Sequence, residues 1–173
     1  MSKIKQIFTR FLVALLFLTA TEAYAQTSTF ILMRHAEKDT TAQGSTMMQA
    51  YPPLSAEGTA RAARIPEVLK MYQPDAIYST NFKRTKSTVD PLSVKTGKEI
   101  QVYDHRNLKG FAEELLKMQG KTVVVAGHSN STPMLVNLLL KENKYQNLDE
   151  SVYDTYWVVT VTDGKAEAKI MKY

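Results

Sequence analysis

Residues 30–38 of this 173-residue chain read FILMRHAEK, an apolar run that ends in an arginine beside a histidine. Arg34 carries a planar fork of N–H donors that matches the oxygen atoms of a phosphoryl group. The imidazole of His35 can attack phosphorus when it is uncharged, and a neighbouring positive charge favours the uncharged form. The pair therefore indicates phosphoryl chemistry just beyond the end of a strand, provided that the rest of the chain supplies partners.

The elements that must position this pair alternate between short apolar runs and helical patterns, which predicts an α/β fold. The continuous β-branched run TVVVA at 122–126 is typical of a strand that is buried on both faces. Asp163-Gly164 predicts the turn of an antiparallel hairpin near the C-terminal end. We expect a mostly parallel sheet flanked by helices. Its strands are predicted at 29–33, 75–79, 100–103, 122–126, 156–162 and 165–171, and its helices at 55–69, 83–95, 111–119 and 132–141.

Further polar side chains follow other strands of the predicted sheet. Arg84 comes a few residues after the second strand, and His128 comes directly after the run at 122–126. Because the carboxyl ends of parallel strands meet at one edge, these side chains should join Arg34 and His35 in one site. The two arginines would hold the charge of a phosphoryl group, and one histidine would attack it.

Four motifs in this order resemble those of the histidine phosphatase superfamily, the phosphoglycerate mutase-like fold. They are Arg34-His35-Ala36-Glu37, Pro53-Leu54-Ser55-x-x-Gly58, Ser79-x-x-x-x-Arg84-Thr85-x-x-Thr88 and Gly127-His128-Ser129-Asn130.

The resemblance implies a three-layer α/β/α fold and a role for each matching residue. His35 would be the phosphorylated nucleophile, Arg34 and Arg84 would bind phosphate, and His128 would be the second histidine. Ala36 stands where the superfamily usually has glycine. Ser129 stands where the phytase-like branch has an aspartate, so phytase-like activity is not expected.

A general acid is harder to assign from the sequence. Related enzymes often take a carboxylic acid from the segment between Arg84 and His128. Within it, Asp104 is the one carboxylate that follows a predicted strand, which makes it the tentative general acid, although an ordinary loop aspartate fits the same pattern. His105, in a polar stretch, is interpreted as structural or exposed.

Two other functions compete with a phosphatase. Gly127-His128-Ser129-Asn130-Ser131 approaches the nucleophile elbow of serine hydrolases, but no histidine follows Ser129 to complete a triad in the usual chain order. A phosphoryl-binding module that has the same fold and has lost turnover remains the alternative.

The N-terminal 25 residues resemble a signal peptide. A basic start leads into an apolar run at 11–20 and then Ala23-Tyr24-Ala25, which predicts cleavage before Gln26. The run is shorter than the roughly 20 residues that span a bilayer, so no stable membrane anchor is expected after cleavage. We expect one catalytic domain at 26–173, located in the periplasm or secreted.

Composition restricts the chemistry and the partners. The chain has no cysteine, which excludes thiol catalysis and cysteine-based metal sites, and no metal or cofactor is expected. Loss of three basic residues and one acidic residue with the signal peptide lowers the formal charge from +5 to about +3, too little to indicate nucleic-acid binding. The expected partner is a small phosphorylated substrate or a phosphoprotein. The sequence carries no sign of an oligomeric state.

Overall fold

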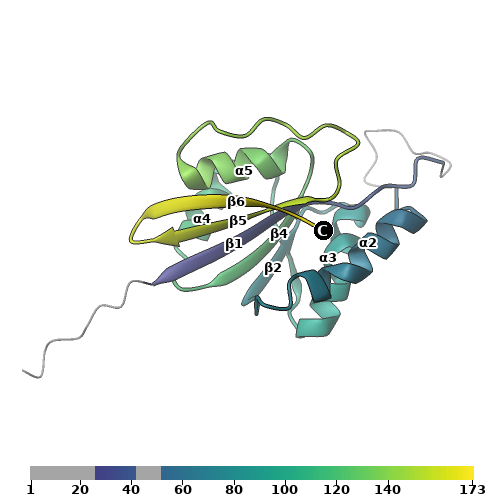
Figure 1. The fold of residues 1–173 in the computed structure, drawn as a ribbon, viewed down its shortest axis with the longest axis horizontal. Coiled ribbons are helices and arrows are strands. Elements are labelled where there is room, and N and C mark those ends of the chain that lie inside the picture. Colours follow the sequence, from purple (N-terminus) through teal and green to yellow (C-terminus); the bar gives the residue numbers. More distant parts are fainter. Residues whose placement is uncertain (1–25, 42–51) are drawn as a thin grey trace, which may run out of the picture.

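The computed structural model of the protein describes residues 26–41 and 52–173. In these residues a six-stranded sheet runs in the order β3-β2-β4-β1-β5-β6 (Figure 1). The strands are β1 (Thr27–Arg34), β2 (Ala76–Ser79), β3 (Ile100–Val102), β4 (Thr122–Gly127), β5 (Thr155–Thr162) and β6 (Lys165–Lys172), and the helices are α2 (Ala56–Val68), α3 (Lys83–Thr96), α4 (Leu108–Leu116) and α5 (Ser131–Leu140). The signal peptide predicted for residues 1–25 lies outside the described residues.

Strands β3, β2, β4 and β1 are parallel, whereas β5 pairs antiparallel with β1, and β6 pairs antiparallel with β5. The predicted α/β class, with a mostly parallel sheet and a C-terminal hairpin, is confirmed. Asp163 and Gly164 both have positive φ angles, 51° and 77°, as the turn that joins β5 to β6 requires.

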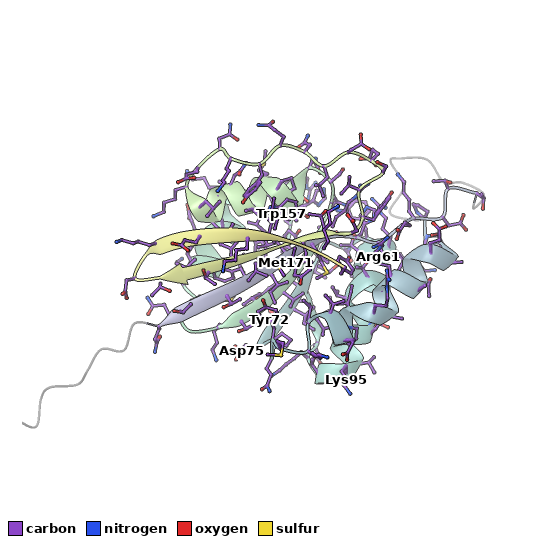
Figure 2. All side chains as sticks on the ribbon, viewed as in Figure 1. Arg61, Tyr72, Asp75, Lys95, Trp157 and Met171 are labelled. Carbon is purple, nitrogen blue, oxygen red and sulfur yellow. The ribbon has the colours of Figure 1, made fainter. Side chains whose placement is uncertain are left out.

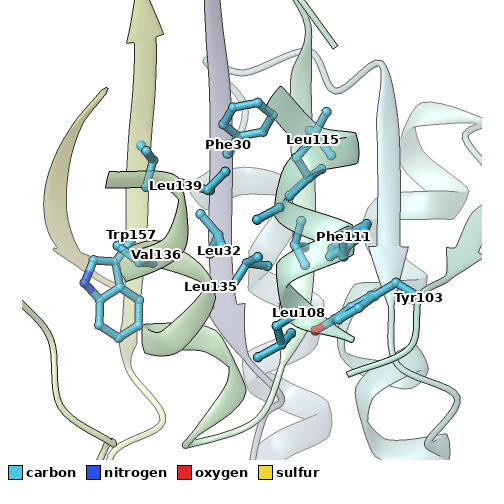
Figure 3. Close-up of a cluster of buried hydrophobic side chains, with 14 residues drawn as sticks. Phe30, Leu32, Tyr103, Leu108, Phe111, Leu115, Leu135, Val136, Leu139 and Trp157 are labelled. Atoms are coloured by element: carbon cyan, nitrogen blue, oxygen red, sulfur yellow. The ribbon is translucent and has the colours of Figure 1, made fainter. Parts of the chain in front are cut away.

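The central strands β1 and β4 are buried on both faces because helices cover the sheet from two sides. Alternate residues of β1 supply each side: Phe30 and Leu32 pack under α4 and α5, and Ile31 and Met33 pack under α2 and α3. Figure 3 shows the first of these clusters, in which Trp157 of β5 closes one end. The result is the predicted layer of helices, sheet and helices.

The register of the sheet brings the carboxyl ends of four strands to one edge. Arg34 at the end of β1 pairs with Gly127 at the end of β4, and Ser79 at the end of β2 pairs with Ala126. Ser79 also pairs with Val102, the last residue of β3. Side chains that follow these four strands therefore start close together.

Helix α4 begins at Leu108 and ends at Leu116, so the predicted span 111–119 was wrong at both ends. The side chain of Asn107 accepts a hydrogen bond from the backbone N–H of Gly110, which caps the helix one turn earlier than the apolar pattern indicated. Pro66 lies in the last turn of α2. No helix in the described part of the chain is long and apolar enough to cross a membrane.

Candidate active site

His35 begins the loop after β1, and hydrogen bonds fix its ring. Its Nδ1 atom lies 2.7 Å from the carbonyl oxygen of Ala36. Because a carbonyl only accepts hydrogen bonds, we assign the ring hydrogen to Nδ1. Nε2 is then the acceptor, and it receives a hydrogen bond from Nε of Arg84 at 3.1 Å. The unshared electron pair of this imidazole thus lies on Nε2.

The environment of His35 keeps the ring uncharged. Burial is the largest effect that lowers its pKa to about 3; the charges of Arg84, Arg34 and Lys38 act in the same direction, while the hydrogen bond to Ala36 opposes them. The side chain is only 4% exposed. At neutral pH the ring is therefore uncharged, the form in which an imidazole can act as a nucleophile.

Helix α3 supports the backbone beside His35. The backbone N–H of Ala36 donates to the hydroxyl of Thr88 at 2.9 Å, and that hydroxyl donates to the carbonyl of Arg84 at 2.8 Å. All three residues are buried. One threonine of α3 thus ties the loop of His35 to the helix turn that carries Arg84.

Helix α2 holds the loop from its other side. The carbonyl of Glu37 accepts a hydrogen bond from the backbone N–H of Ser55, which caps α2, and a Cβ atom at Gly58 would lie 2.1 Å from this carbonyl oxygen. The carboxylate of Glu37 is paired with Arg61 of α2, which also donates to the backbone carbonyl of Tyr173. Figure 2 shows Arg61 near the last residues of the chain. The motif Pro53-Leu54-Ser55-x-x-Gly58 therefore supports the loop of His35.

Arg84 lies in the first turn of α3 and is 8% exposed. Its guanidinium carbon is 4.7 Å from the ring centre of Phe82, the residue that precedes the helix. Burial, followed by the charge of Arg34, lowers its pKa, but a guanidinium starts so high that it stays protonated. A side chain that only adds charge to a solvated helix face would be exposed, so the burial of Arg84 does not fit that role.

His128 follows β4 and lies beside His35, with 5.4 Å between the ring centres. Its Nε2 atom is 3.0 Å from the hydroxyl oxygen of Thr80, which follows β2. Burial is the main cause that lowers its pKa to about 3, with smaller effects from nearby groups led by His35 and Arg84. His128 is therefore also uncharged at neutral pH and can donate one N–H hydrogen bond.

Arg34 is 1% exposed, and most of its donors are used within the protein. Its NH1 group contacts the backbone carbonyls of Asp149, Glu150 and Val152 at 2.9–3.2 Å, and NH2 is paired with the carboxylate of Glu150 at 2.9 Å. Its guanidinium carbon lies 4.0 Å from the ring centre of Tyr153. Nε has no hydrogen-bond partner within the described residues. The NH1 and NH2 groups of Arg34 thus hold the segment at 149–153 in place, and its Nε–H has no partner among the described residues.

The segment after β3 places two neighbouring side chains differently. Both carboxylate oxygens of Asp104 face Arg106, at 3.1 and 3.4 Å, and the side chain is 49% exposed. The ring of His105 lies 5.5 Å from that of His128 and 5.4 Å from that of Phe82. The histidine that the sequence left as structural or exposed therefore reaches the site, whereas Asp104, the predicted acid, is bound to a neighbour in its own turn.

Comparison with known proteins agrees with this arrangement. The sequence model of the histidine phosphatase superfamily (branch 1) matches residues 30–109, which include His35 and Arg84. Over this stretch, a little under half of its length, the chain is similar to the histidine phosphatase superfamily. No match to a curated protein was found.

Solved structures of the superfamily share the fold at low sequence identity. The SixA protein of Nakamurella multipartitia is 20% identical with a TM-score of 0.61, and the alignment covers 85% of this chain and 95% of that one. The protein histidine phosphatase SixA in complex with tungstate is 16% identical with a TM-score of 0.63, covering 83% and 96%. A mycobacterial glucosyl-3-phosphoglycerate phosphatase is 17% identical with a TM-score of 0.63, covering 86% and 99%.

The structure brings His35, Arg84 and His128 together, and Arg34 directly precedes His35 in the chain. The sequence did not place His105 or Tyr153 in the site. The ring centre of Tyr153 lies 6.1 Å from that of His35. A signal for His105 was present, since it follows the third parallel strand. No local signal marked Tyr153. Within the described residues, no three His, Cys, Asp or Glu side chains are grouped so that they could hold a metal ion.

Proposed function

We propose that the protein is a metal-independent phosphatase that hydrolyses a phosphomonoester or a phosphoprotein through a phosphohistidine on His35. Arg84 and Arg34 would bind the phosphoryl oxygens, and His128 would donate a further hydrogen bond to them. The match of residues 30–109 to the superfamily model and the fold shared with known phosphatases support this proposal. One of those structures binds tungstate, a tetrahedral oxyanion with the shape of phosphate.

One observation carries the proposal: Nε2 of His35 is unprotonated, and a buried arginine donates a hydrogen bond to it at 3.1 Å. An uncharged imidazole whose electron pair faces a fixed positive charge is suited to attack a phosphoryl group that the same charge binds.

In the first step, an oxygen of the phosphoryl group replaces Nε2 of His35 as the acceptor of the hydrogen bond from Nε of Arg84. The electron pair on Nε2 of His35 is then free to react. Nε2 then forms a bond to phosphorus while the bond to the leaving oxygen breaks, and the leaving oxygen takes that electron pair and a proton. Arg84 and the unused Nε–H of Arg34 hold the charge of the equatorial oxygens. Nδ1 keeps its proton through the hydrogen bond to Ala36, which orients the ring for an in-line attack.

In the second step, water attacks the phosphorus atom, and the bond from phosphorus to Nε2 breaks. The electron pair returns to Nε2, phosphate leaves, and the water proton passes to a base. Both steps use the same oxygen contacts, so the arginines act twice in each cycle.

Trapping the intermediate tests the proposal. The purified protein is mixed with a ³²P-labelled phosphomonoester and quenched in alkali, where a phosphohistidine survives; on acid treatment it is lost. We expect such an adduct in the wild type and none in His35→Ala, whose activity should also disappear. Circular dichroism checks that the variant is folded. Wild-type activity in a folded His35→Ala would overturn the mechanism.

The alternative, a phosphoryl-binding module without turnover, shares the same contacts and differs in outcome. Phosphate or vanadate would bind, and the binding would weaken in Arg84→Ala, but a panel of phosphate esters at several pH values would give neither hydrolysis nor a phosphoenzyme. The same panel identifies the preferred substrate class if turnover is present.

We further propose that residues 1–25 are a signal peptide and that the mature domain, 26–173, acts in the periplasm or outside the cell. N-terminal sequencing of the protein from a bacterial host tests this. A mature chain that starts at Gln26 and is found outside the cytoplasm is expected, and an uncleaved cytoplasmic chain would contradict it.

A further inference from the structure

The carboxyl end of β3 contributes a histidine to the site. His105 lies three residues beyond Val102, the last residue of β3, and its ring is half-buried. It is 5.5 Å from the ring of His128, which in turn is 5.4 Å from the ring of His35. The ring planes of His105 and His128 meet at 69°, and those of His128 and His35 meet at 70°. The three histidines thus form a row that begins at the nucleophile and ends at a partly solvated ring.

The proposed reaction needs a proton for the leaving oxygen, and the two inner histidines are poorly suited to supply it. Burial lowers the pKa of both His35 and His128 to about 3, so neither carries an extra proton at neutral pH. The single ring hydrogen of His35 is held by the carbonyl of Ala36. A donor must therefore come from another group near the site.

The described carboxylates near the site are bound as anions. Hydrogen bonds from Arg106 lower the pKa of Asp104. A hydrogen bond from Ser129, with a further effect of Arg34, lowers the pKa of Glu150 despite some burial. Burial alone would raise the pKa of Glu37, but its bonds to Arg61 outweigh this and lower it. An acid that has already lost its proton cannot give one to a leaving group.

We propose that His105 is the proton donor to the leaving group, an inference that rests on the proposed phosphatase function. As the bond from phosphorus to the leaving oxygen breaks, the His105 imidazolium transfers one proton to that oxygen and becomes neutral. In the second step the neutral ring takes one proton from the attacking water and returns to the imidazolium. Over one cycle His105 is regenerated and one water molecule is consumed.

The surroundings of His105 suit this exchange. The ring is partly solvated, so it can exchange protons with water. The groups that face it are the ring of Phe82 from the segment after β2 and the neutral ring of His128 from the segment after β4. The charged neighbours in its own turn, Asp104 and Arg106, are paired with each other. The ring centre of Phe82 is also 4.9 Å from that of His128, with the two ring planes nearly perpendicular. One aromatic ring thus contacts both histidines.

The test compares leaving groups that differ in their need for a proton. His105→Gln is assayed with an alkyl phosphomonoester and with 4-nitrophenyl phosphate, whose leaving group is stable as an anion. We expect kcat/KM for the alkyl ester to fall by about 100-fold or more, and that for 4-nitrophenyl phosphate by less than about tenfold. Lys109→Gln, an exposed substitution four residues away, is the control and should leave both rates unchanged.

The outcomes separate this inference from the function on which it rests. If the wild type hydrolyses neither ester and forms no phosphohistidine, the proposed function fails. If the wild type is active and His105→Gln slows both esters equally, or neither, only the assignment of His105 is wrong. A selective loss of alkyl-ester activity in Asp104→Asn or Tyr153→Phe, without one in His105→Gln, would overturn it in favour of that group.

Discussion

Replacing Thr88 by valine removes a single oxygen atom at the point where α3 supports the loop of the nucleophile. Valine has the shape of threonine, so the change opens no cavity at this fully buried position. The carbonyl of Arg84 keeps a partner, because an α-helix supplies it with the backbone N–H four residues later. The N–H of Ala36 loses its acceptor at 2.9 Å, in a residue that is 0% exposed. A buried donor left unpaired costs about 1–3 kcal/mol in the free energy of unfolding.

Denaturant unfolding and thermal melting measure this loss, and each kcal/mol should lower the melting temperature by about 2–4 °C in a domain of this size. Thr96→Val in the same helix is the matched control. The hydroxyl of Thr96 donates to the carbonyl of Leu92 at 2.7 Å, and among the described residues it accepts no hydrogen bond from another element. The control should lose no more than about 0.5 kcal/mol. Equal stability of the two variants would refute the argument that Thr88 holds the loop of His35.

Three further predictions concern the site and its supports. Arg84→Ala should raise the transition-state free energy by about 2–4 kcal/mol, and inhibition by phosphate and vanadate should weaken in parallel; unchanged inhibition constants would contradict its role in phosphate binding. His35 and His128 have an ordinary pKa of 6.5 when unfolded and about 3 when folded, so below pH 6.5 the unfolded chain binds protons that the folded chain does not. Unfolding titrations should show stability falling as the pH drops below 6.5, at a rate that approaches about 1.4 kcal/mol per pH unit for each histidine near pH 5, and a flat profile would count against both values. Gly58→Ala should destabilise the protein by about 1–3 kcal/mol in thermal melts, although alanine favours helices, because its Cβ would lie 2.1 Å from the carbonyl oxygen of Glu37; a stabilised variant would show that the loop can yield.

Strong local patterns predicted most of the fold. The run at 122–126 forms β4, and Asp163-Gly164 makes the turn between β5 and β6. Both signals are local, because a β-branched run and a turn with two positive φ angles need no distant partner to be recognised. The convergence of His35, Arg84 and His128 also followed from the sequence, since the ends of parallel strands meet at one edge.

Contacts between distant segments could not be predicted in the same way. The donors of Arg34 are taken up by backbone carbonyls more than 100 residues later in the chain, which no local pattern specifies. The choice between Asp104 and His105 depended on which of two adjacent side chains turns inward. The backbone N–H of Arg106 donates to the carboxylate of Asp104, and this short turn holds the carboxylate beside the guanidinium of Arg106. The catalytic roles assigned to these residues, and the signal peptide, stay predictions.

The position of β1 in the sheet has a consequence for how the chain is made. This strand is the first to be synthesised, yet its two neighbours, β4 and β5, begin at Thr122 and Thr155. A ribosome-bound chain therefore leaves one edge of the apolar strand β1 unpaired until β5 has been synthesised. Pairing partners this far apart in sequence delay folding, because a long loop must close before the contacts can form. Synthesis is thus nearly complete before β1 has both of its neighbours in the sheet.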